Sequence, residues 1–445
     1  MFLLLVEAFK ISRWKSMRVF VKSFGCSTNI ADGSVLAGCL SEAGYEIVDS
    51  VSSSDIVVYN TCAVKGPTEN RILALVEKVP AEKKLIILGC LPLINRERIE
   101  KEVRFDGLAG PAIGKKIVNI VNYVAKGEKV FAVEERLVDK PGLALPRLNS
   151  SRVVSIVPIS YGCLGSCAYC CVVFARGRLR SYSVNQVVSR IKDDVKTGFH
   201  EFWLTAQDTA SYGRDIGTDL AVLLNMVCHV DGDFRVRVGM MTPDMVHGIL
   251  ADLVTAYRHE KIFKFVHLPV QSGDDGVLKQ MRRLYTADDF KKVVSTFRSY
   301  YPHMTFSTDI ICGFPGETAE AFQKTLNLID ETKPDVVNVS KFFPRPLTTA
   351  AKMQDKFVAS SDVKRRSGEA VRSVRKIAIE KNIEWVGWKG RVLVDEVGKD
   401  VGSWIGRNFA YKPIVLKSTK DLLGSTLTVE VAKAFPTFLE GRIIA

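Results

Sequence analysis

The chain has 445 residues, 47% hydrophobic and 25% charged, which is the composition of a globular protein with about three domains. Lys and Arg outnumber Asp and Glu by 62 to 49, a formal net charge of +13 that favours a polyanionic partner. Ten cysteines are too sparse for a disulfide scaffold in a chain of this length and indicate reduced, metal-binding thiols.

The first residues, MFLLLVEAFK, form an apolar run too short for a membrane span of ~20 residues. They also lack the basic region and the small-residue cleavage site of a secretory signal. Met17 opens a well-formed strand, so residues 1–16 are interpreted as an upstream extension. We therefore expect a cytoplasmic protein without an export signal or a membrane anchor.

Residues 17–126 alternate short apolar runs with stretches of helical spacing. The runs MRVFVKSFG, DIVVYN and KLIILG are brief and rich in branched side chains, which is typical of buried strands. The stretches between them, GSVLAGCLSEAG and TENRILALVEKV, have the period of helices. This alternation predicts an α/β domain built on a doubly wound parallel sheet.

Each of these three strands runs directly into a cysteine: Cys26, Cys62 and Cys90, called here the N-terminal cysteine set. The carboxyl ends of parallel strands line one crevice, so we expect the three thiols to converge. Taken singly, each is more commonly a small buried core residue. The same position occupied three times favours a three-cysteine iron–sulfur site with one open iron.

Residues 127–152 show neither the period of a helix nor that of a strand, and they are interpreted as a linker. A second alternation of strands and helices begins at Val153. Its six candidate strands are VVSIVPI, EFWLTA, FRVRVG, KFVHLPV, TFSTDII and VVNVSKFF. In barrels made of such repeats, function lies at the carboxyl ends of the strands.

The first of these strands leads into Cys163, Cys167 and Cys170, called here the central cysteine set. Three close thiols hold three irons of a [4Fe–4S] cube and leave the fourth open, which indicates chemistry rather than a structural role. A zinc knot is the alternative, but no fourth Cys or His follows at finger spacing. The stretch SYGCLGSCAYC resembles the signature of radical S-adenosylmethionine (SAM) enzymes, whose open iron binds the cofactor.

Three further stretches, FGCSTNIADGSVLAG, YNTCAVKGPTENR and LGCLP, resemble the amino-terminal domain of the methylthiotransferases. The segments NTCAVKGPTEN and GCSTN…ADG resemble those of the family branch that modifies N6-threonylcarbamoyladenosine at position 37 of tRNA. The resemblance implies an α/β fold with a doubly wound N-terminal domain, an incomplete (βα)6 radical SAM barrel and a small antiparallel β-barrel, the RNA-binding TRAM domain. We expect the N-terminal domain to span residues 17–126, a linker residues 127–152, the radical SAM barrel residues 153–384 and the TRAM domain residues 385–445.

Polar residues stand at other strand ends of the barrel, where a bound cofactor supplies hydrogen-bond partners to buried polar groups. Ordinary loop capping is the alternative for any one of them. The resemblance implies cofactor contacts for Gln207, Asp208, Gln271 and Asp309, and a position near the adenine for Tyr169. The other cysteines, Cys39, Cys171, Cys228 and Cys312, are interpreted as core residues.

Arg176, Arg178 and Arg180 follow the central cysteine set and are candidates for contact with an RNA backbone, although a solvated basic turn is the alternative. The family loop PRPGTPAAKM reads PRPLTTAAKM here, with Leu347 in place of a glycine.

The last sixty or so residues contain three candidate strands, KGRVLVDEV, YKPIVL and LLGSTLTVEVAKAF, which suggest a small barrel. Within this segment aromatic and cationic residues interleave, a pattern suited to unpaired bases: Arg407, Phe409, Tyr411 and Lys412.

The resemblance implies that a cluster on the central cysteine set cleaves SAM to a radical that removes hydrogen from C2 of adenine. That C–H bond requires a one-electron cofactor. A second [4Fe–4S] cluster on the N-terminal cysteine set would hold or supply sulfur, and a further SAM would donate the methyl group. The expected partners are the tRNA anticodon stem-loop, from which the base can be splayed, and a flavodoxin- or ferredoxin-like reductant. The sulfur donor is not specified.

Other functions are compatible with the same cysteines. The substrate is alternatively isopentenyladenosine at position 37 of tRNA, or an aspartate of a ribosomal protein. A reading from another class is a non-catalytic iron–sulfur protein that binds RNA.

Overall fold

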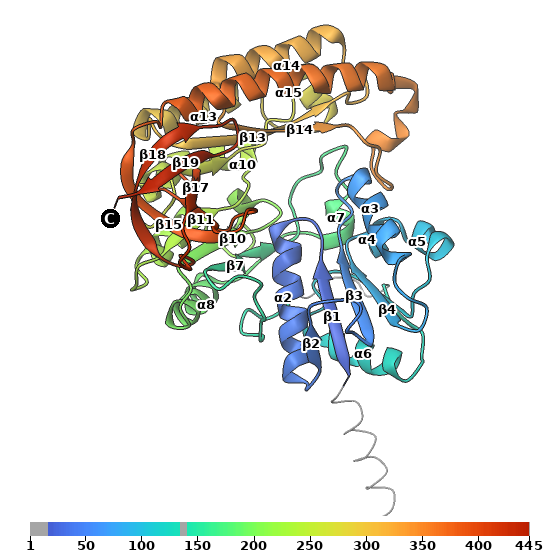
Figure 1. Ribbon diagram of the computed structural model, residues 1–445. Coiled ribbons are helices and arrows are strands. Elements are labelled where there is room, and N and C mark those ends of the chain that lie inside the picture. Colours follow the sequence, from blue (N-terminus) through green and yellow to red (C-terminus); the bar gives the residue numbers. More distant parts are fainter. Residues whose placement is uncertain (1–16, 134–139, 445) are drawn as a thin grey trace, which may run out of the picture.

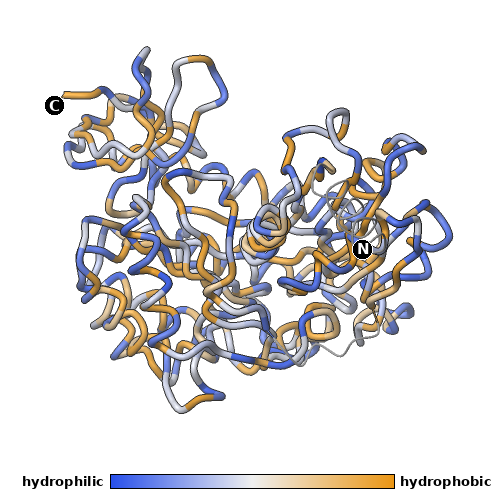
Figure 2. The backbone as a smooth tube through the Cα atoms, turned by 90° about the horizontal axis from the view of Figure 1, so that it is seen from below, coloured by the Kyte–Doolittle hydropathy of each residue, from blue (hydrophilic) through white to orange (hydrophobic). Residues whose placement is uncertain are grey.

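The computed structural model describes residues 17–133 and 140–444, so the expected upstream extension, residues 1–16, lies outside the described residues. The chain forms an N-terminal α/β domain, a larger central α/β domain and a C-terminal barrel (Figure 1). Figure 2 shows hydrophobic segments in all three domains. Within the described ranges no helix is long and apolar enough to cross a membrane.

The N-terminal domain contains a six-stranded sheet, in the order β2-β1-β3-β4-β5-β6, whose neighbouring strands are all parallel. Its strands are β1 (Arg18–Ser23), β2 (Glu46–Val48), β3 (Ile56–Thr61), β4 (Lys84–Gly89), β5 (Gly107–Ala109) and β6 (Val130–Ala132). The sequence predicted the three long strands and missed the three-residue ones, which are too short to show a period. The linker prediction is therefore wrong for Val130–Ala132, which pairs with β5 at the edge of the sheet.

Helices cover both faces of this sheet, as a doubly wound fold requires. One face packs against α2 (Ser27–Glu42) and α6 (Ile117–Ala125), which follows the short helix η1 (Gly114–Lys116). The other packs against α3 (Gly66–Val76), α4 (Leu91–Ile94) and α5 (Arg96–Glu102). The second core also receives Cys171 and Ala175 from the central domain, so the two domains share a hydrophobic core.

The central domain has all six predicted strands, and they lie in chain order as two parallel three-stranded sheets. They are β7 (Val154–Pro158), β10 (Glu201–Thr205), β11 (Arg235–Val238), β12 (Phe265–His267), β13 (Thr305–Cys312) and β14 (Val336–Lys341). A parallel bridge between Val236 and Ile262 joins the two sheets. The result is the open six-stranded half-barrel that the resemblance implied.

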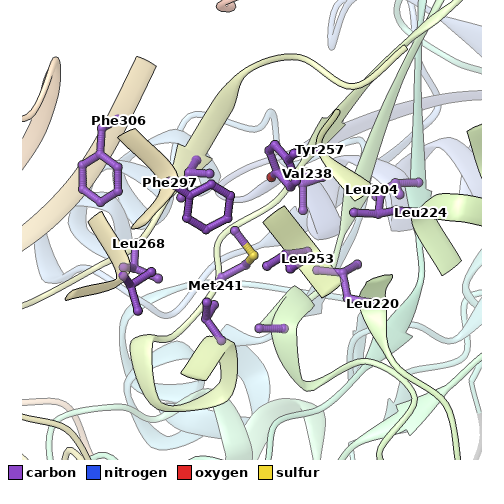
Figure 3. Packing of buried hydrophobic residues seen from close by; sticks show 14 of the residues in the cluster. Leu204, Leu220, Leu224, Val238, Met241, Leu253, Tyr257, Leu268, Phe297 and Phe306 are labelled. Atoms are coloured by element: carbon purple, nitrogen blue, oxygen red, sulfur yellow. The ribbon is translucent and has the colours of Figure 1, made fainter. Parts of the chain in front are cut away.

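The helices between these strands supply one continuous core (Figure 3). Their bounds are α8 (Val184–Lys196), α9 (Leu220–Cys228), α10 (Pro243–His247), α11 (Leu250–Ala256), α12 (Asp275–Gln280), α13 (Ala287–Tyr300), α14 (Ala319–Thr332) and α15 (Ser360–Ile383), with short helices η2 (Thr209–Ser211), η3 (Ala350–Lys352) and η4 (Gln354–Lys356). Capping boxes at Ser183 and Thr286 fix the starts of α8 and α13. Cys228 and Cys312 are buried in this core, as predicted.

The C-terminal domain is a closed barrel in the order β15-β16-β17-β19-β18. Its strands are β15 (Lys389–Val397), β16 (Ser403–Arg407), β17 (Pro413–Lys417), β18 (Thr426–Ala434) and β19 (Leu439–Ile443). Four neighbouring pairs are antiparallel, and β17 pairs with β19 in parallel, which closes the barrel. The sequence indicated three of the five strands.

One buried carboxylate fastens the N-terminal domain to the central domain. Glu69 of α3 is 1% exposed and accepts hydrogen bonds from Arg345 (2.5 Å), Arg98 (2.8 Å) and Asn95 (2.7 Å). Arg345 lies in the loop after β14. In that loop Leu347 has φ +68°, so it keeps a left-handed backbone that favours the glycine of the family loop.

Candidate functional site

The central cysteine set lies in the loop that joins strand β8 (Ser160–Tyr161) to helix α7 (Val172–Arg176). After α7 the chain returns as β9 (Arg180–Ser181), which pairs antiparallel with β8. Gly162 has φ +79°, and a Cβ there would meet the carbonyl oxygen of Arg178 at 2.0 Å, so only glycine fits. Its amide donates to Oε1 of Gln207 at 2.7 Å. The loop is therefore held at the carboxyl end of β10 through a residue that the sequence singled out.

The three central thiols lie in one loop with backbone donors beside them. A Cβ on Gly165 would lie 3.3 Å from Sγ of Cys163 and 3.6 Å from Sγ of Cys167. The amide of Gly165 donates to Cys163, and the amide of Val172 donates to Cys170. Burial raises the pKa of Cys163 to about 11 and also raises that of Cys170, so these groups are neutral thiols until a bound metal displaces their protons.

The three cysteines of the N-terminal cysteine set follow β1, β3 and β4, which are neighbours in the sheet. Cys26 begins α2, Cys62 follows β3 and Cys90 begins α4, and each interacts electrostatically with the other two. Gly25 has φ +102°, and a Cβ there would meet Sγ of Cys62 at 2.6 Å. Burial raises the pKa of Cys90 to about 12, although the charge of Arg176 opposes this rise.

Three cysteines without a fourth protein ligand are the donor set that a cube with one open iron takes. Each iron of a cube takes one thiolate, so the three sulfurs stay apart. Across residues 17–133 and 140–444, no three His, Cys, Asp or Glu side chains are drawn together as around one metal ion. The remaining N-terminal cysteine, Cys39, is buried in the sheet core, and Cys171 is buried with its thiol donating to the carbonyl of Ala63.

A buried polar network that the sequence analysis did not predict joins the two cysteine sets. Arg176, at the end of α7, donates to Oδ1 of Asn29 (2.5 Å) and to Oδ2 of Asp32 (2.7 Å). Tyr161 donates to the other oxygen of Asp32 at 2.6 Å. The partners lie far apart in sequence, and only the polar residues on the buried face of α2 hint at them.

The polar residues at the strand ends divide into two groups. Gln207 bridges the domains, because it accepts from Gly162 and contacts Thr28 of α2 at 3.5 Å. Asp208 is satisfied by protein donors: it accepts from the amide of Ala210 and from the amide and hydroxyl of Thr242. These bonds are those of ordinary loop capping, which the sequence analysis gave as the alternative to a cofactor contact for Asp208.

Asp208 gives a testable pH dependence. Burial raises its pKa from 3.8 to about 6, against the hydrogen bonds from Thr242. A raised pKa means that its contribution to stability is present below pH 3.8 and is lost as the pH rises through 6. Relative to the isosteric D208N, the parent apoprotein should lose about 1–2 kcal/mol of unfolding free energy between pH 4.5 and 7.5. Urea denaturation at both pH values measures this, and a constant difference would contradict it.

Gln271 follows the carboxyl end of β12 and lies beside Asp309, which is in the middle of β13. Gln271 has φ +70°, a strained backbone, and its amide donates to the carbonyl of Asp309 at 2.8 Å. The carboxylate of Asp309 accepts from His267 (3.0 Å) and Asn338 (2.6 Å), two residues that the sequence reading missed. Burial opposes ionisation of Asp309, but these bonds and the charge of Lys65 lower its pKa. The N-terminal domain thus presents a cation to this end of the barrel.

Tyr169 lies in a different environment, packed edge-on against Phe314 at 6.3 Å. Its hydroxyl accepts a 2.6 Å hydrogen bond from Arg283, which the sequence reading also missed. The tyrosine is therefore fixed beside the central cysteine set.

Four of the predicted RNA contacts are corrected by the structure. Arg176, Tyr411 and Lys412 are 2%, 9% and 4% exposed, and the side chain of Arg407 is 15% exposed. Arg176 binds the N-terminal domain, as described above. Tyr411 packs against Phe263 and Phe265 of the central domain, Lys412 forms an ion pair with Asp335 at 2.8 Å, and Arg407 pairs with Asp395. Arg176, Tyr411 and Lys412 therefore dock one domain onto another, whereas Arg407 is held by an ion pair within the C-terminal barrel.

The remaining candidates lie at the surface. Arg178 is exposed and Arg180 is partly exposed, with a hydrogen bond to the carbonyl of Arg176. Phe409 is 42% exposed. It lines a cleft of about 140 Å³ between the C-terminal barrel and the amino ends of β10 and β11, together with Trp388, Arg235 and Arg391 among others.

Three family models match successive parts of the chain. Residues 18–110 match an uncharacterized protein family, UPF0004; residues 157–329 match the Radical SAM superfamily; and residues 386–444 match the TRAM domain. Among solved structures, the radical SAM methyltransferase TsrM from Kitasatospora setae shares the fold, with a TM-score of 0.54 at 15% identity, over 75% of this chain and 76% of that one.

Curated relatives match along nearly the whole chain. A probable threonylcarbamoyladenosine tRNA methylthiotransferase of Pyrococcus horikoshii is 42% identical over 432 residues, which are 96% of this chain and 100% of the relative. The threonylcarbamoyladenosine tRNA methylthiotransferase of Homo sapiens is 32% identical over 440 residues, which are 96% of this chain and 74% of the relative. The chain therefore belongs to the family of threonylcarbamoyladenosine tRNA methylthiotransferases.

Proposed function

We propose that this radical SAM methylthiotransferase converts N6-threonylcarbamoyladenosine at position 37 of tRNA to its 2-methylthio derivative, using two [4Fe–4S] clusters. The observation that carries the proposal is the pairing of two three-cysteine sets in adjoining domains, both at the carboxyl ends of parallel strands. Family membership makes the chain an iron–sulfur enzyme that uses SAM. The second cluster and the individual residue roles are our own inference.

When bound, a cluster on the central cysteine set supplies the single electron that radical chemistry on SAM requires. The chain's own residues hold and enclose the reactants. Gln207 fixes the cysteine loop, and the bond from Arg283 fixes Tyr169 beside it. His267 and Asn338 keep Asp309 ionised, ready to accept from the hydroxyl or amino groups of the cofactor.

The N-terminal cysteine set fits the task of holding sulfur, because its three thiols leave one iron of a cube open. Gln207 contacts Thr28 of the N-terminal domain, and Thr205 contacts Ser27 at 2.6 Å, so the two sites share one polar seam. A further SAM would donate the methyl group, and an electron donor of the flavodoxin or ferredoxin kind and a sulfur donor would complete the reaction.

Iron counting tests the two-cluster proposal directly. Anaerobically prepared protein should hold about eight irons and eight sulfides per chain, and the variant C163A/C167A/C170A should hold about four. Iron analysis, acid-labile sulfide and EPR give these counts. Four irons in the parent and none in the variant would show that the second cluster does not exist, and would contradict the proposed sulfur site.

The exposed ring of Phe409 is the strongest remaining candidate for contact with tRNA. Its ring makes tilted contacts with Trp385 and Trp388, and Arg391 lines the same cleft with its side chain 64% exposed. An exposed ring with cations around it suits an unpaired base. Phe409→Ala should weaken tRNA binding about 5- to 100-fold, as measured by filter binding at fixed salt. Val401→Ala, on the exposed surface of the same barrel, is the control, and equal affinities of the two variants would contradict the assignment.

A further inference from the structure

One arginine of the central domain reaches into the N-terminal domain and ends beside its cysteine set. Arg176 closes helix α7, which begins two residues after Cys170 of the central cysteine set. Its guanidinium is 2% exposed and lies over the ring of Tyr161 at 5.7 Å. One of its terminal nitrogens, Nη2, is fully occupied by Asn29 and Asp32.

The other terminal nitrogen, Nη1, is buried and has no hydrogen-bond partner among the described residues. The guanidinium interacts electrostatically with the thiols of Cys90 and Cys26, and α7 packs against α4, the helix that Cys90 begins. A buried charged donor without an acceptor costs free energy, so native proteins rarely leave one unpaired. The observation therefore points to an acceptor that belongs at the cysteine site.

Sulfur of an iron–sulfur cluster meets this need. A cube held by three thiolates is anionic and presents both thiolate and sulfide acceptors, and N–H donors and nearby cations raise its reduction potential. Asp32 binds Nη2 of the guanidinium, which leaves Nη1 without an acceptor among the described residues. A guanidinium, with its fixed fork of donors, can serve both partners at once.

We propose that Arg176 is a positioning residue of the N-terminal cysteine set, where its Nη1–H donates to a sulfur of the bound cluster and its charge raises the reduction potential of that cluster. The proposal rests on the second cluster of the proposed function. It also explains how the two sites are held in register, because α7 begins two residues after Cys170 and ends at Arg176.

The test uses the full chain with the substitutions C163A/C167A/C170A, so that only the N-terminal cluster is observed. In this background Arg176→Gln should keep about four irons and lower the midpoint potential in an EPR-monitored redox titration. Arg178→Gln removes an equal charge from the exposed neighbour and should leave the potential at the parent value. Arg176→Lys keeps the charge and should restore most of the shift.

An unchanged potential in Arg176→Gln, with iron retained, overturns the proposal and leaves the second cluster standing. Absence of iron from the C163A/C167A/C170A parent overturns the second cluster itself, and the proposal with it. If Arg176→Gln loses its iron, the iron content and midpoint potential of Arg176→Lys test the proposal instead. Retained iron at the parent potential supports the proposal, whereas loss of iron in this variant too overturns it, because the residue then only packs the domain interface.

Discussion

Cys62→Ala is expected to cleave SAM at close to the parent rate and to form no 2-methylthio product, a fall of at least about 100-fold. Cys62 belongs to the N-terminal cysteine set, so its loss removes a ligand of the proposed sulfur site and leaves the central cysteine set intact. Chromatography of 5′-deoxyadenosine and mass analysis of tRNA nucleosides measure the two steps separately.

Cys39→Ala is the matched control, because it removes another buried thiol of the same domain from the core beside α2. It should retain both steps. Full methylthiolation by Cys62→Ala would contradict the proposed role of the second cluster. The same nucleoside analysis identifies the substrate, since product formed on isopentenyladenosine instead would favour the alternative tRNA reading.

Glu69→Gln is expected to lower the free energy of unfolding of the apoprotein by about 3–5 kcal/mol and to weaken the contact between the first two domains. The carboxylate is buried and paired with Arg345 and Arg98. The amide of glutamine brings N–H groups toward guanidinium donors, so Arg345, itself 3% exposed, is left as an uncompensated buried charge.

Urea denaturation followed by circular dichroism measures this loss. Glu97→Gln, an exposed glutamate on the neighbouring helix α5, is the control and should change stability by less than about 0.5 kcal/mol. A loss below 1 kcal/mol in Glu69→Gln would show that the interface does not depend on this ion pair.

The strands that lead into cysteines were predictable because their signal is local. The six-residue strands β1, β3 and β4 each contain a run of three or four apolar residues, and the rule that parallel strand ends share one edge predicts that Cys26, Cys62 and Cys90 lie near one another. Short strands such as β6 carry no such signal, so Val130–Ala132 was assigned to a linker.

The sequence by itself therefore determined the order of the three domains, the six cysteines in two sets and the family to which the chain belongs. Tertiary structure alone decided the use of the charged and aromatic residues near them. Arg176 and Asp32 are 144 residues apart, and Lys412 and Asp335 are 77 apart, so no local pattern could reveal that each pair is buried. A basic or aromatic side chain looks the same in sequence whether it faces RNA or another domain. Only the packing of the domains supplies the buried partner that offsets the cost of removing its charge from water.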